Sequence, residues 1–163
     1  MHSTEVVTRE ARDTDLEQLF ENFVRRFADR LAEHVAGECV FLVAELGDQV
    51  VGHVTVRWRS AYPYFRDNGI PEIHDLNVVE KHRRRGIASR LVDEAEHRIR
   101  RVADFAGIGF GLPPGYRAAQ SMYIRRGYVP DGQGVYWKDH YPPEMAHVVL
   151  DEDLVLYLTR RLR

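Results

Sequence analysis

A short basic run at residues 83–88 carries the residue types that a diphosphate-binding site requires. The run reads Arg83-Arg84-Arg85-Gly86-Ile87-Ala88. A helix that begins here would present free backbone N–H groups, and its dipole would favour a negatively charged ligand. Gly86 lets the backbone approach that ligand closely, and the arginines can pair with phosphate oxygens. The run therefore predicts a phosphate loop, although the six residues taken alone fit a solvated surface turn at least as well.

Other ligand classes fit this chain less well. The sequence has no Gly-Lys-Ser/Thr step, which excludes a Walker A loop. Gly107, Gly109 and Gly111 are closely spaced, but a proline pair follows them where a dinucleotide-binding motif needs a helix. A basic loop could also bind nucleic acid, but acidic residues such as Glu80 lie beside it.

The elements that would position the loop follow from hydrophobic periodicity and turn residues. Asp13 is placed to cap a first helix, and Gly47-Asp48 marks a hairpin turn. The predicted strands cover residues 5–9, 40–46, 49–58, 72–79, 105–112, 128–137 and 154–159. The predicted helices cover residues 13 to about 27, a second segment that ends near residue 35, and residues 84–102 and 116–126; residues 59–70 form a loop. This order indicates a mixed α/β domain.

The segment from residue 84 to residue 102 has the clearest helical pattern. Its apolar side chains recur at helical spacing on one face, at Ile87, Leu91, Ala95, Ile99 and Val102. Two i,i+4 pairs of opposite charge are expected on the outer face, Glu94 with Arg98 and Glu96 with Arg100. After the next helix, Gly127 stands where a left-handed C-cap belongs.

Residues 72–102 resemble the acetyl-CoA-binding motif of the GNAT (GCN5-related N-acetyltransferase) superfamily. In that family an Arg/Gln-x-x-Gly-x-Gly/Ala loop joins the fourth strand to a long helix, and residues 83–88 match it. A second family motif, Ala-x-x-Leu-Tyr-x-x-x-Gly-Phe, is similar to Ala119-Gln120-Ser121-Met122-Tyr123-Ile124-Arg125-Arg126-Gly127-Tyr128. Two motifs in the expected order are far more specific than either one. The order of elements also matches the family fold over nearly the whole chain.

The resemblance implies one GNAT-like domain over residues 1–163. Its α/β fold would have a mixed, mostly antiparallel sheet with a central V-shaped splay, flanked by helices. The splay would lie between the strand that ends at Val79 and the strand that ends near Leu112. It would hold the pantetheine arm of acetyl-CoA as a pseudo-strand. The residues implied as contacts of acetyl-CoA are Leu76, Asn77, Val78, Arg83, Arg84, Arg85, Gly86, Ile87, Ala88 and Ser89.

Acyl transfer from a thioester to an amine requires a proton acceptor, donors for the developing oxyanion and an acid for the leaving thiolate. The resemblance implies Tyr123 as that acid, because a tyrosine with a reference pKa of about 10 donates at neutral pH. The backbone N–H of Val78 would face the thioester carbonyl. Glu72, eleven positions before Arg83, stands where some members of the family carry a glutamate base. A solvated carboxylate, with a water chain as the base, is the alternative.

Two neighbouring features bear on the acceptor side. In a regular strand His74 points to the same side as Glu72, and Asp75 faces away unless a bulge intervenes. The aromatic cluster at residues 62–65 is either a wall of the acceptor site or a loop that packs on itself.

Bulk properties set the remaining expectations. The chain has 163 residues and a net charge of -2, so no global field favours nucleic acid or a membrane surface. No apolar stretch is long enough to span a bilayer, and the first residues do not resemble a signal peptide. Cys39 is the single cysteine, which fits a reducing cytoplasm, and the histidines lack metal-ligand spacing.

We therefore expect a cytoplasmic N-acetyltransferase that needs no metal. It would move an acetyl group from acetyl-CoA to a primary amine of a small molecule or peptide, by direct attack in a ternary complex. Homodimers are frequent in the family, and the exposed face of the last strands is a candidate interface. The alternatives are a non-catalytic acyl-CoA-binding sensor module and a nucleic-acid-binding domain.

Overall fold

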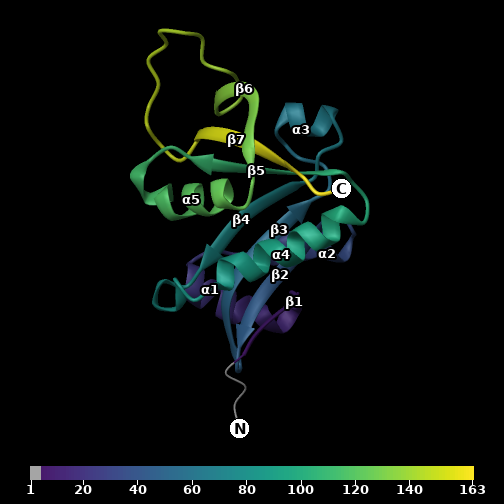
Figure 1. Ribbon diagram of the computed structural model, residues 1–163. Coiled ribbons are helices and arrows are strands. Elements are labelled where there is room, and N and C mark those ends of the chain that lie inside the picture. Colours follow the sequence, from purple (N-terminus) through teal and green to yellow (C-terminus); the bar gives the residue numbers. More distant parts are fainter. Residues whose placement is uncertain (1–4) are drawn as a thin grey trace.

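A seven-stranded sheet with helices on both faces forms the framework of the computed structural model, which describes residues 5–163 (Figure 1). The strands are β1 (Val6–Glu10), β2 (Cys39–Leu46), β3 (Gln49–Arg57), β4 (Glu72–Val78), β5 (Phe105–Gly111), β6 (Val129–Trp137) and β7 (Leu154–Arg161). The helices are α1 (Leu16–Phe23), α2 (Ala28–Val35), α3 (Pro63–Asp67), α4 (Ile87–Arg100) and α5 (Arg117–Arg125). Neighbouring strands in the order β1-β2-β3-β4-β5-β7-β6 are antiparallel, except that β4 and β5 are parallel. The predicted fold class is confirmed.

Each face of the sheet has its own apolar cluster. On one face α4 buries Leu91, Val92 and Ile99 completely against the strands. On the other face α1 and α2 cover a smaller cluster that includes Leu19 and Phe41. Figure 1 shows α4 lying across the front of β2, β3 and β4, with α1 and α2 behind the sheet. Since α4 follows β4 after a short loop, this packing fixes the helix N-terminus beside the end of that strand.

The sheet opens between its two parallel strands. Within the described residues, β4 and β5 pair at two positions, Glu72 with Gly107 and Ile73 with Ile108. Beyond them β5 continues alongside β7, whereas β4 continues alongside β3. The opening therefore widens from Ile73 toward the start of α4, as the predicted splay requires (Figure 1).

Three predicted boundaries were wrong. The first helix ends at Phe23 and not near Phe27, because Val24 adopts a left-handed φ of 52° and donates its N–H to Phe20. Asp13 does not cap this helix but begins a 3-10 turn, Asp13–Asp15, that precedes it. The expected loop at residues 59–70 contains α3, whose Phe65 is fully buried.

The alternating glycines of β5 have a packing role. Ala106, Ile108 and Phe110 belong to the cluster under α4, so the glycines between them face the opposite side of the sheet. A Cβ atom on any of these glycines would overlap an aromatic ring: Phe65 at Gly107, Tyr157 at Gly109 and Tyr116 at Gly111. The glycines of β5 therefore make room for aromatic rings and not for a dinucleotide.

Candidate active site

The phosphate loop joins β4 to α4 with the conformation that its sequence predicts. Gly86 has a left-handed φ of 76°, and a side chain there would meet no atom within 4 Å. The helix begins at Ile87 and not at Arg84, and no side chain among residues 5–163 caps its N-terminus. The first backbone N–H groups of α4 are therefore free to bind an anion beside an open backbone.

The side chains of the loop differ in exposure and in the contacts that they make. Arg84 and Arg85 are exposed, whereas Ile87 is buried in the core and can offer a ligand only its backbone N–H. Arg83 donates from Nε to the carbonyl oxygen of Val78 at 3.0 Å, so it ties the loop to the end of β4. Ser89 donates to the sulfur of Met122 at 3.7 Å, which links the first turn of α4 to α5.

The main chain of β4 is available along the opening. The N–H of Val79 donates to Val51 on β3 at 2.9 Å. Because backbone groups alternate in a strand, the N–H of Val78 points the other way, into the opening. This orientation suits the main-chain pairing that was expected for Leu76, Asn77 and Val78.

Tyr123 lies on the same face of the sheet as α4. Its side chain is buried, with 5% exposure, and its ring centroid is 6.1 Å from that of Tyr128. In the part of the chain that the structure describes, the Tyr123 hydroxyl has no hydrogen-bond partner. Burial raises the pKa of Tyr123 above its ordinary value, so the group stays a protonated donor at neutral pH. The Tyr123 hydroxyl is thus a buried, protonated group on the α4 side of the sheet.

Glu72 lies on the opposite face, at the closed end of the opening. Ile73 packs in the cluster under α4, so its neighbours Glu72 and His74 point away from that helix. Glu72 is buried, with 5% exposure, and accepts a hydrogen bond of 2.5 Å from Ser60. His74 places Nδ1 3.5 Å from the second carboxylate oxygen of Glu72. The predicted pairing of these two side chains on one side of the strand is confirmed.

Asp75 does not face away, contrary to the expectation for a regular strand. It has a φ of 55°, and the pairing of β4 with β3 shifts register around it, as in a β-bulge. The extra residue reverses the parity, so the carboxylate turns to the side of α1 and α2. There it forms ion pairs with Arg25 and Arg30.

The aromatic residues of loop 59–70 pack on themselves and on β7. Tyr62 is buried and stacks on Tyr157 with ring centroids 3.7 Å apart. Its hydroxyl donates to Asp131 at 2.7 Å and accepts from Tyr141 at 2.8 Å. Tyr64 stays partly exposed at the edge of this layer. The layer lies on the same face of the sheet as Glu72, and its contacts are those of a loop that packs on itself and on β7.

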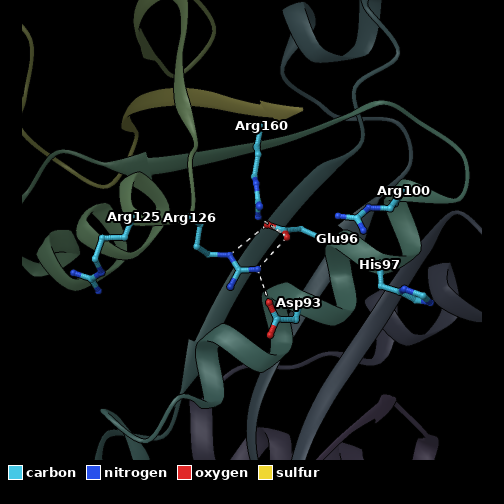
Figure 2. Close-up of a pocket in the computed structure, with 7 residues that line it drawn as sticks. All are labelled: Asp93, Glu96, His97, Arg100, Arg125, Arg126 and Arg160. Atoms are coloured by element: carbon cyan, nitrogen blue, oxygen red, sulfur yellow. Dashed lines mark hydrogen bonds and ion pairs between the residues drawn. The ribbon is translucent and has the colours of Figure 1, made fainter. Parts of the chain in front are cut away.

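A second buried carboxylate lies on the α4 side of the sheet, and the sequence analysis misplaced it. Glu96 is 6% exposed and does not pair with Arg100 on the outer face. Arg126 and Arg160 approach it at 3.0 Å and 2.9 Å, and Tyr128 donates to it at 2.8 Å. Figure 2 shows these two arginines converging on Glu96, Arg126 from the C-cap of α5 and Arg160 from β7. Helical spacing explains the position, because residue 96 follows Val92 by four and precedes Ile99 by three, both of which are buried.

The sequence and the fold of this chain are similar to those of known proteins. Residues 5–128 match the model of the Acetyltransferase (GNAT) family. The chain belongs to this family. No curated protein sequence matches it significantly.

Solved structures that resemble this GNAT protein include several acetyltransferases. An N-acetyltransferase from Staphylococcus aureus has 16% identity and a TM-score of 0.71, over 98% of this chain and 99% of that chain. A ribosomal-protein-alanine N-acetyltransferase from Brucella melitensis has 18% identity and a TM-score of 0.70, over 95% and 99%. NAA60 from Arabidopsis thaliana, solved with a bisubstrate analogue, has 16% identity and a TM-score of 0.67, over 96% and 98%. At these identities the likeness shows the fold alone.

Among residues 5–163, no three His, Cys, Asp or Glu side chains lie close enough together to hold a metal ion. No helix in the same range is long and apolar enough to cross a membrane.

Two of the features singled out by sequence lie along the opening between β4 and β5. The loop from Arg83 to Ser89 lies at its wide end, and Glu72 at its closed end. The sequence analysis missed Ser60 and the arginines that hold Asp75, because these contacts join segments 12 to 50 residues apart. No local pattern signals such pairs.

Proposed function

We propose that this GNAT protein transfers the acetyl group of acetyl-CoA to a primary amine of a small molecule or peptide, by direct attack within a ternary complex. The observation that carries the proposal is the opening between β4 and β5, which widens toward the uncapped N-terminus of α4. Tyr123 lies on one face of the sheet beside it and Glu72 on the other. A fold neighbour named as an acetyltransferase of ribosomal-protein alanine supports a peptide among the acceptors.

The residues present fit acetyl-CoA, which would supply the thioester carbonyl and the thiolate leaving group. Its diphosphate suits the free N–H groups of Ile87, Ala88 and Ser89 and the open backbone at Gly86. The exposed Arg84 adds positive charge beside them. The arm then suits the main chain of β4 along the opening, as an added strand.

The distance between Glu72 and Val78 along β4 limits where the reacting carbonyl can lie. Six residues of strand separate Glu72 from Val78, which is about 20 Å at 3.3 Å per residue. A single carbonyl therefore cannot contact the N–H of Val78 while its attacking amine contacts Glu72. We place the carbonyl at the closed end of the opening, beside the bulge at Asp75 and Leu76, and Val78 against the arm.

The positions of Glu72 and Tyr123 on opposite faces of the sheet suggest how the protons move. The amine gives up a proton toward Glu72, with His74 as the neighbouring relay at 3.5 Å. The nitrogen bonds to the carbonyl carbon as the carbon–sulfur bond breaks. Tyr123, which a reference pKa of about 10 keeps protonated at neutral pH, gives its proton to the sulfur. General acid and base on opposite faces keep the two transfers apart.

The test is an acetyl-CoA assay over a panel of primary amines and N-terminal peptides, reading released thiol and acetylated product. At least one acceptor should release thiol at a rate well above the hydrolysis of acetyl-CoA. A thermal-shift titration with CoA accompanies it, since a ligand specific to the native state raises the unfolding temperature. Stabilisation by CoA without turnover on any amine would favour the sensor module, and no stabilisation at all would reject the proposal.

A further inference from the structure

We propose that Asp75 is the positioning residue of the acyl site, and that its ion pairs with Arg25 and Arg30 hold the β4 bulge in the shape that the thioester requires. The inference rests on the proposed function and adds to it the residues that hold the β4 bulge in place. The anchor comes from Arg25, in the segment between α1 and α2, and from Arg30 on α2, 50 and 45 residues away in sequence.

The backbone at Asp75 departs from strand geometry at the point where the sheet opens. His74 pairs with Thr55, and Asn77 pairs with His53, so Asp75 and Leu76 together lie opposite the single residue between those partners. The last pairing with β5 is at Ile73, two residues earlier. A bulge re-aims the backbone groups that follow it. Here those groups are the ones that line the closed end of the opening.

The conformation of Asp75 needs support from outside the strand. A φ of 55° lies in the left-handed region, which aspartate tolerates better than most residues but which remains uncommon. The carboxylate accepts from Arg25 at 2.7 Å and from Arg30 at 2.5 Å, one arginine on each oxygen. Burial works to raise the pKa of Asp75, but these hydrogen bonds outweigh it and hold the pKa well below its usual range. The anchor is thus charged throughout the working pH range.

Arg30 is itself held rigidly. Its side chain is 13% exposed, compared with 47% for Arg25, and its guanidinium lies over the rings of Phe27 and Phe41 at 5.6 Å and 5.9 Å. Beneath these rings His53 is fully buried, and burial lowers its pKa to about 4, so it carries no charge at neutral pH. Arg25 also lies over the ring of Phe27, at 5.2 Å, but it is 47% exposed, so Arg30 is the better buried of the two partners of Asp75.

The test separates the acyl end from the rest of the cofactor by comparing acetyl-CoA with CoA. In Asp75→Ala, which favours neither the φ nor the ion pairs, we expect kcat to fall about 100-fold, the size of a small misplacement of reacting groups. Affinity for CoA should stay within about twofold. Any excess stabilisation by acetyl-CoA over CoA in the wild-type protein should disappear. Asp75→Asn, which tolerates the left-handed φ, should recover part of both readouts.

Two further variants separate positioning from stability. Arg30→Ala should copy Asp75→Ala, and the double variant should be no slower than either, because both remove the same contact. Asp15→Asn is the matched control, since Asp15 is also buried and paired with an arginine, Arg9, but lies away from the opening. It should lower the unfolding temperature and leave kcat and the acetyl-CoA comparison unchanged.

The outcomes are distinct. A kcat for Asp75→Ala within about threefold of wild type, or effects of Asp75→Ala and Arg30→Ala that multiply in the double variant, would overturn the inference. So would a fall in kcat for Asp15→Asn as large as for Asp75→Ala. These results would leave the proposed function standing if the wild-type protein still turns over. A wild-type protein that does not bind CoA would remove both.

Discussion

Two buried carboxylates, Glu72 and Glu96, are nearly equal in exposure, at 5% and 6%, but different groups contact them. Glu96 faces two guanidinium groups within 3.0 Å and the hydroxyl of Tyr128. Glu72 receives one hydroxyl hydrogen bond, from Ser60, and has His74 at 3.5 Å. Within residues 5–163, no lysine or arginine forms an ion pair with Glu72.

The difference shows how to tell a structural carboxylate from one that can do chemistry. Glu96 is held by two guanidinium groups and a hydroxyl, and these contacts lock α4 to the C-cap of α5 and to β7. Glu72 has Ser60 and His74 as its polar side-chain partners and no lysine or arginine among residues 5–163, an arrangement that costs stability and that proteins keep where a proton must move. Figure 2 makes the first case visible, since two arginines reach Glu96 while Arg125 points away from it.

The largest effect is expected for Glu72→Gln. The amide keeps the shape and the hydrogen bond from Ser60 but cannot accept the amine proton, so kcat should fall by about 1,000-fold. The unfolding temperature should change little, because no ion pair with a lysine or arginine is lost. Steady-state kinetics with acetyl-CoA and the best acceptor, together with thermal unfolding, measure both.

Glu94→Gln is the matched control for this variant, since Glu94 is a half-buried carboxylate on α4 that pairs with Arg98 at 2.7 Å. Its kcat should equal that of the wild type. If Glu72→Gln kept more than a tenth of wild-type kcat, a water chain would replace Glu72 as the base.

Tyr123→Phe should lower kcat by about 100-fold, because the leaving thiolate loses its proton donor. Affinity for CoA should be unchanged, since the loop that binds the diphosphate is not altered. Tyr128→Phe is the control, because Tyr128 packs near Tyr123 but donates its hydroxyl hydrogen bond to Glu96. Loss of that hydrogen bond should lower the stability of the protein and leave kcat unchanged. Equal losses of kcat in the two variants would remove the role of Tyr123 as acid.

Glu96→Gln should do the reverse of Glu72→Gln. It leaves Arg126 and Arg160 facing a neutral amide, and removing one partner of a buried ion pair is strongly destabilising. Because Arg160 is about a third exposed, we expect a loss of about 2 kcal/mol in the free energy of unfolding, below the range for fully buried pairs. Urea denaturation measures this loss. An unchanged midpoint would mean that solvent already compensates the arginines.

The comparison also marks what sequence can predict. The loop, the opening and Tyr123 lie in contiguous motifs whose spacing encodes a strand, a turn and a helix, so their positions follow from local rules. Glu96 was assigned to the outer face because an i,i+4 partner stood nearby, yet the contacts that bury it come from residues 30 and 64 positions away. For Asp75 the sequence left two orientations open, one for a regular strand and one for a bulge, and the strand pattern could not choose because the bulge is held by arginines from other segments.

The smallest effect is expected for His74→Ala, and it tests whether the partners of Glu72 can be replaced. The imidazole is 35% exposed beside Glu72, so water can take over part of a relay, and kcat should fall only about tenfold. Added imidazole should restore part of that loss, because a small base can enter the space left by the side chain. His97→Ala, at an exposed position on α4, should show neither loss nor rescue. A loss that imidazole does not relieve would mean that His74 shapes the strand and moves no proton.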